Sequence, residues 1–99
     1  MEISETLKEN VCRLSLDGRL DTTTAPELDT KLSEVIGKDI KELTLDFKGL
    51  EYISSAGLRV LLRGQKMMNG KGTMVITNVK DELMEIFEMT GFNDILNIQ

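Results

Sequence analysis

Apolar and polar residues alternate in four short stretches of the chain, and this period of two residues predicts β-strands. The stretches are residues 2–8 (EISETLK), 11–18 (VCRLSLDG), 41–50 (KELTLDFKGL) and 73–78 (TMVITN). The first is expected to be an edge strand, and the second is expected to end at the turn-forming pair Asp17-Gly18. Cys12, Leu14 and Leu16 share one face of the second strand, so Cys12 is expected to be a small core residue.

Three other stretches carry apolar residues at helical spacing, together with signals for their ends. They cover residues 24–37, 56–72 and 79–91, and a short strand or irregular tail is expected at residues 92–99. Thr24 and Glu27 have the T-x-x-E spacing of a capping box, which favours a helix start there. Gly37 stands where the C-cap of that helix belongs, and Gly91 ends the third helix in the same way.

The resulting element order is β-β-α-β-α-β-α followed by the short tail, within one α/β domain that spans residues 1–99. Strands that are separated by helices usually run parallel, through right-handed crossovers. The opening hairpin adds one antiparallel pair. The sequence therefore predicts a mixed, mostly parallel β-sheet flanked by helices.

The charge of the chain narrows the choice of partners. The formal net charge is −5 with an isoelectric point near 4.7, which argues against nucleic acid because most of the surface would repel phosphates. No apolar stretch approaches the roughly 20 residues that span a bilayer, so no direct membrane insertion is expected. The opening residues MEISETLKEN lack the basic and apolar regions of a signal peptide, and a cytoplasmic protein is expected.

The residue inventory also limits the available chemistry. The chain has no histidine and one cysteine, which excludes Ser-His-Asp and Cys-His catalysis and His-containing or multi-thiolate metal sites. Asp17, Asp21, Asp46 and Glu51 are better explained as solvated loop carboxylates than as an acid–base pair. The segment GQKMMNGKGT fails the Walker A spacing and precedes a strand, so it is not a phosphate loop. No enzymatic activity, cofactor or metal is expected.

A basic stripe lies along the second predicted helix. Arg59, Arg63 and Lys66 recur at helical spacing beside the apolar face. They are equally consistent with an ordinary exposed helix face and with part of a protein interface.

Two adjacent serines precede the second helix, in YISSAGLRVLL. Ser54 or Ser55 is expected to be the N-cap, accepting a hydrogen bond from a free amide, worth ~1 kcal/mol. One capping serine is enough, which leaves the other hydroxyl without a structural role. After a parallel strand, that hydroxyl lies on the rim where such sheets bind ligands and partners. A phosphate attached there meets the helix dipole and free amides, which both favour an anion.

The segments LTLDFKGLEYISSAGLRVLL and LDGRLDTTTAPELDTKL resemble the STAS domain of bacterial anti-sigma factor antagonists. The resemblance covers almost the whole chain in element order and length. In that family, a strand with L-D-φ is followed by D-S-[ST]-G-L at the start of a helix. The first serine of that motif is phosphorylated by the partner, an anti-sigma factor that is also a serine kinase.

Placed on this sequence, the motif puts Ser55 at the phosphorylated position, with Ser54 as the alternative acceptor. The residues expected around the phosphosite and in partner binding are Asp21, Asp46, Ser54, Ala56, Gly57 and Arg59. Two positions depart from the family pattern. Ser54 replaces the acidic residue before the phosphoserine, and Ala56 replaces the following serine or threonine.

The resemblance implies an anti-sigma factor antagonist that binds the anti-sigma factor serine kinase when unphosphorylated, releasing the sigma factor. Phosphorylation of Ser55 switches this binding off, and a PP2C-type phosphatase is the implied enzyme for its reversal. The protein is expected to be a monomer or a weak homodimer. The alternative is an accessory STAS subunit that scaffolds an ABC-type membrane transporter without phosphorylation, and the neighbouring genes separate the two.

Overall fold

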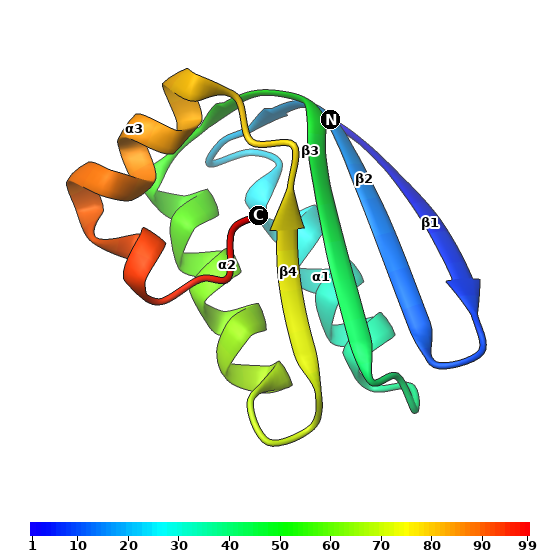
Figure 1. Ribbon diagram of the computed structural model, residues 1–99. Helices are drawn as coiled ribbons and strands as arrows, with labels where there is room; N and C mark the ends of the chain where they lie inside the picture. Colours follow the sequence, from blue (N-terminus) through cyan, green and yellow to red (C-terminus); the bar gives the residue numbers. More distant parts are fainter.

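Every strand and helix that the hydrophobic pattern predicts is present in a computed structural model, which describes residues 1–99. The elements are β1 (Glu2–Lys8), β2 (Val11–Leu20), α1 (Ala25–Ile36), β3 (Glu42–Ile53), α2 (Ser55–Met68), β4 (Thr73–Thr77), α3 (Asp81–Thr90) and a 3-10 turn η1 (Phe92–Asp94). The four strands form one sheet in the order β1-β2-β3-β4 (Figure 1). β1 pairs antiparallel with β2, and the other two pairs are parallel, so the mixed α/β fold is confirmed.

β2 and β3 run further than the sequence indicated. β2 was expected to end at Asp17-Gly18, but it continues to Leu20, and β3 continues to Ile53. Gly18 makes the continuation possible because its φ of 112° is a backbone conformation that other residues rarely adopt. Two register shifts accompany it, between Ser15 and Asp17 and again after Gly18. The two strands therefore end side by side, with Leu20 opposite Ile53.

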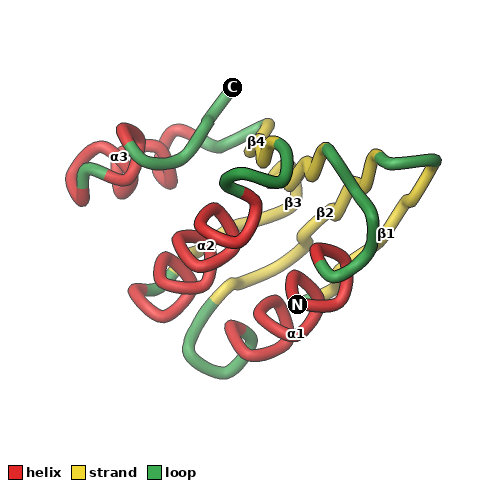
Figure 2. The backbone as a smooth tube through the Cα atoms, turned by 90° about the horizontal axis from the view of Figure 1, so that it is seen from below, coloured by secondary structure: helices red, strands yellow, loops and turns green.

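α1 and α2 lie together on one face of the sheet, and no helix covers the opposite face (Figure 2). Their buried apolar residues pack against the inward residues of β2 and β3, including Cys12, which is fully buried as expected. α2 approaches α1 closely at Gly64, where an added Cβ would lie 3.0 Å from Leu32 Cδ1. α3 lies beyond β4 (Figure 2), and its Phe87 stacks on Phe47 of β3 with ring centroids 6.4 Å apart.

The predicted capping box of α1 is wrong, although the helix begins where it was expected. Thr24 occupies the N-cap position but makes no capping bond with its side chain. Its hydroxyl instead donates to the carbonyl of Arg19 at 2.8 Å and accepts from the amide of Asp21 at 2.9 Å. The threonine is therefore used to tie the β2–α1 loop to the end of β2, and Glu27 has no capping partner.

The tail after Gly91 is mostly irregular, which confirms the second of the two forms that the sequence allowed. Gly91 ends α3 in the left-handed conformation, with φ 78°. After η1, Ile98 forms a single parallel bridge with Ile76 on the free side of β4. This bridge gives β4 a partner on its outer edge.

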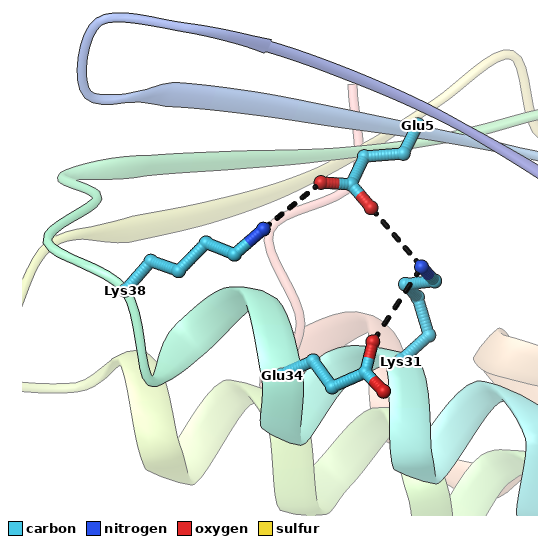
Figure 3. Close-up of polar contacts among 4 residues, drawn as sticks. All are labelled: Glu5, Lys31, Glu34 and Lys38. Carbon is cyan, nitrogen blue, oxygen red and sulfur yellow. Dashed lines mark hydrogen bonds and ion pairs between the residues drawn. The ribbon is translucent and has the colours of Figure 1, made fainter.

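An ion-pair cluster joins the edge strand to α1 (Figure 3). Glu5 of β1 accepts from Lys31 at 3.1 Å and from Lys38 at 3.4 Å, and Lys31 also lies 3.6 Å from Glu34. The hydrogen bond from Lys31 lowers the pKa of Glu5, and the same contact raises the pKa of Lys31. The cluster places an acidic side chain beneath β1, on the face that the helices cover.

None of the three α-helices has the length and apolar character that crossing a membrane requires.

Candidate functional site

The start of α2 is fixed by Ser54. Its backbone is extended, with φ −98° and ψ 172°, and its hydroxyl accepts from the amide of Gly57 at 3.3 Å. Its own amide donates to the carbonyl of Leu20 at 2.8 Å, which joins the end of β3 to the end of β2. Ser54 is therefore the capping serine that the sequence required.

Ser55 is the first residue of α2, and it is exposed. Its side chain takes no part in any hydrogen bond within the chain. Both serines thus have distinct surroundings, because Ser54 is half-buried and bonded while Ser55 is free and open to solvent. Of the two hydroxyls, only that of Ser55 is exposed and takes no part in capping α2.

Gly57 sets how closely α2 approaches the strands. A Cβ built on it would lie 2.7 Å from Leu20 Cγ and 3.1 Å from Ile53 Cγ1. Those distances are shorter than van der Waals contact, so only glycine allows α2 to begin against the ends of β2 and β3. Its amide also supplies the capping bond to Ser54.

Asp21 lies in the β2–α1 loop at the same end of the sheet. It directly follows Leu20, whose carbonyl binds Ser54, so the structure brings this loop to the serines. Its carboxylate accepts from the amides of Thr23 at 3.0 Å and Thr24 at 3.1 Å. The Thr24 amide is the main cause of the lowered pKa of Asp21, which keeps a negative charge at this rim.

Asp46 is not brought to the serines, contrary to the expectation. It lies seven residues before Ile53, roughly 20 Å along β3 at the usual strand rise. Its side chain points to the uncovered face of the sheet, because its neighbours Leu45 and Phe47 point into the core. The resemblance identified the aspartate but could not show which way it faces.

Asp46 instead holds β2, β3 and the β4–α3 loop together. Its carboxylate accepts from Arg13 at 2.7 Å, from Asn78 at 2.9 Å and from the Lys48 amide at 3.0 Å. Burial alone would raise the pKa of this carboxyl, but the hydrogen bonds from Asn78, Lys48 and Arg13 outweigh it, so the pKa is lowered. In the structure, Asp46 therefore stabilises the pairing of β2 with β3 and the position of the β4–α3 loop.

Replacing Asp46 by asparagine is expected to lower the free energy of unfolding at neutral pH by about 1–2 kcal/mol, because charge-assisted hydrogen bonds are lost. Since the pKa of Asp46 is lowered in the fold, the ionised carboxylate stabilises the protein above its unfolded pKa of about 3.9. That stability is lost as the pH falls through the folded pKa. Urea unfolding of parent and Asp46→Asn should therefore differ at pH 7 and converge below about pH 4. A constant difference down to pH 2 would contradict this.

A shallow groove of about 310 Å³ runs between α1 and α2, next to the serines. Its lining residues are Thr22, Ala25, Pro26, Asp29, Ala56, Arg59, Val60 and Arg63. Ala56 follows Ser55 directly, so the groove opens beside the exposed hydroxyl. The sequence indicated the α2 half through its basic stripe, but the α1 half was missed because no local pattern shows which helices will pair.

A second feature that the sequence did not indicate lies at the ends of the strands. The guanidinium of Arg19 sits 4.1 Å from the ring centroid of Tyr52, its register partner on β3. Tyr52 is partly exposed, so this pair adds an amphipathic side chain to the same end of the sheet as Ser54. The sequence does not indicate this contact, because Arg19 and Tyr52 become partners only through a register shift between β2 and β3.

The arrangement offers an exposed hydroxyl near a groove, and no group of three His, Cys, Asp or Glu side chains is placed to hold a metal ion. The chain belongs to the STAS domain family, whose model matches residues 2–99. BtrV of Bordetella bronchiseptica, a candidate anti-sigma factor antagonist, is 34% identical over 84 residues, which cover 84% of this chain and 72% of BtrV.

Solved structures share the fold. An anti-sigma factor antagonist from Mycobacterium paratuberculosis superimposes with a TM-score of 0.89 at 18% identity, covering 98% of this chain and 83% of that one. The Bacillus cell fate determinant SpoIIAA in its phosphorylated form gives a TM-score of 0.77 at 16% identity, covering 99% of this chain and 91% of SpoIIAA. At these identities the likeness establishes the architecture.

Proposed function

We propose that this protein is an anti-sigma factor antagonist that is switched by phosphorylation of Ser55. In the unphosphorylated state it binds an anti-sigma factor serine kinase, which then releases its sigma factor. Transfer of the γ-phosphoryl group of ATP to Ser55 Oγ, with loss of the hydroxyl proton and release of ADP, ends the binding. The observation that carries the proposal is the exposed, unbonded hydroxyl of Ser55 at the first position of α2.

The comparisons support the same class of protein. BtrV and the mycobacterial structure bear names of anti-sigma factor antagonists, and SpoIIAA has been solved in a phosphorylated form. The position of Ser55 at the start of α2 supports the proposal on physical grounds. A phosphate at the start of a helix is favoured by the helix dipole, at roughly 0.3–1 kcal/mol, so the domain stays folded.

The identity of the modified residue can be tested by mass spectrometry. After incubation with the cognate kinase and ATP, the parent is expected to gain one phosphate, and Ser55→Ala is expected to gain none. Ser54→Asn is the matched control, because asparagine preserves the cap and removes only the alternative acceptor. It should be modified like the parent.

Two results would refute this assignment. One is phosphate on the Ser55→Ala variant, and the other is loss of modification in Ser54→Asn while its circular dichroism spectrum matches that of the parent. The first would place the acceptor at a residue other than Ser55, and the second would place it at Ser54.

A further inference from the structure

Arg59 is the one arginine of this chain whose side chain has no partner. Arg13 pairs with Asp46 at 2.7 Å, Arg63 pairs with Asp29 at 2.5 Å, and Arg19 lies over Tyr52. Arg59 is exposed and makes no hydrogen bond, ion pair or aromatic contact. The molecule as a whole carries a net charge of −5, so an unpaired guanidinium stands out on its surface.

The position of Arg59 makes it available to a partner. It lines the groove between α1 and α2, together with the small or apolar side chains of Ala25, Pro26 and Ala56. The other arginine of the groove, Arg63, is already neutralised by Asp29 from α1. The groove therefore presents one uncompensated positive charge beside apolar walls, which fits a carboxylate carried on a short apolar segment.

The same residue is within reach of the proposed phosphosite. Ser55 and Arg59 are four residues apart on α2, so their Cβ atoms lie about 6 Å apart on one face of the helix. A phosphate on Ser55 carries roughly −1.5 to −2 charges and accepts hydrogen bonds from arginine strongly. A carboxylate from a partner carries only one charge.

We infer that the α1–α2 groove binds an acidic side chain of the anti-sigma factor through Arg59, and that phosphate on Ser55 acts by capturing Arg59 within the same helix. The inference rests on the proposed function, and it specifies the chemistry by which the partner is recognised. In this mechanism, phosphorylation removes the one free guanidinium from the interface as well as adding a repulsive charge. The partner's carboxylate is then left facing a phosphate.

A thermodynamic cycle tests the inference. Calorimetry would measure the affinity of the anti-sigma factor for the parent, Arg59→Gln and Lys66→Gln, each with serine and with phosphoserine at position 55. Lys66→Gln is the matched control, since Lys66 is an exposed cation of α2 outside the groove. Arg59→Gln should weaken binding of the unphosphorylated protein about tenfold to a hundredfold. It should also reduce the effect of phosphorylation at least tenfold, because the two changes share one contact.

The control should behave differently in both respects. Lys66→Gln is expected to change the affinity less than threefold and to leave the phosphorylation effect intact. Equal affinities for parent and Arg59→Gln would overturn the inference, and so would an unchanged phosphorylation effect in Arg59→Gln. If the unphosphorylated parent fails to bind the anti-sigma factor, the proposed function itself is wrong. That outcome is distinct from a failure of the Arg59 inference.

A measurement without the partner tests the phosphate contact alone. Phosphorus-31 NMR of the isolated phosphorylated domain reports the second pKa of phosphoserine, ordinarily about 6. Arg59→Gln should raise this pKa relative to the phosphorylated parent, and Lys66→Gln should leave it unchanged. Identical titrations of all three proteins would show that Arg59 does not hold the phosphate.

Discussion

Phosphate on Ser55 is expected to weaken binding to the anti-sigma factor at least a hundredfold while the domain remains folded. The dianion adds a desolvation cost and like-charge repulsion from Asp21, whose carboxylate lies at the same rim. A loss of only ~3 kcal/mol in binding free energy gives this factor. Calorimetry with stoichiometrically phosphorylated and unmodified protein measures it, and thermal unfolding of both samples checks the fold.

Two variants separate the charge from the loss of the hydroxyl. Ser55→Ala should bind as tightly as the unmodified parent, because the unbonded hydroxyl contributes no contact within the chain. It should also keep binding when ATP is added, because alanine has no hydroxyl that can accept a phosphate. Ser55→Asp should bind less tightly than the parent, though with a smaller loss than phosphate causes, since it carries a single charge. Tight binding of the phosphorylated protein would refute the switch.

Gly72→Ala is expected to lower the free energy of unfolding by about 3 kcal/mol or more. A Cβ at this position would lie 2.0 Å from the carbonyl oxygen of Lys41 and 2.7 Å from its carbonyl carbon. The obstacle is backbone, and the same carbonyl accepts the amide of Thr73 at the start of β4. The clash can be relieved only by moving β4 away from β3, which costs more than ordinary overpacking. Urea unfolding followed by circular dichroism measures the loss.

Gly70→Ala is the matched control in the same turn. Nothing lies within 4 Å of a Cβ built on Gly70, but its φ is +81°. Its substitution should cost only about 1–2 kcal/mol, through the left-handed backbone conformation. If Gly72→Ala destabilised the protein no more than Gly70→Ala does, the close approach of Gly72 to Lys41 would not exist in solution.

The elements themselves were predictable because each has a period that reflects one buried face. The stripe of Leu28, Leu32 and Val35 is fully buried on α1, as its helical spacing predicts. The alternation of Leu43, Leu45 and Phe47 likewise gives the inward face of β3. For the site, the pair of serines before a helix predicted one cap and one free hydroxyl, and the structure contains both.

The predictions that failed depend on contacts that residue spacing does not show. Thr24 has the right spacing for a cap, but its hydroxyl oxygen accepts from the amide of Asp21 and its proton is donated to the carbonyl of Arg19. Asp46 was assigned to the phosphosite from its place in a motif, whereas Arg13 and Asn78 hold it on the other face of the sheet. The groove could not be foreseen, since it exists only where α1 and α2 meet.

The cluster of Glu5, Lys31 and Lys38 has a consequence for assembly (Figure 3). The outer border of β1 presents backbone amides and carbonyls with no neighbouring strand, and such borders invite other chains to add themselves. A strand added at this border would cover Glu5, Lys31 and Lys38 and remove their charges from water. An apolar strand has no polar groups to replace that lost hydration. The charged cluster therefore disfavours amyloid-like addition of strands at this border of the sheet.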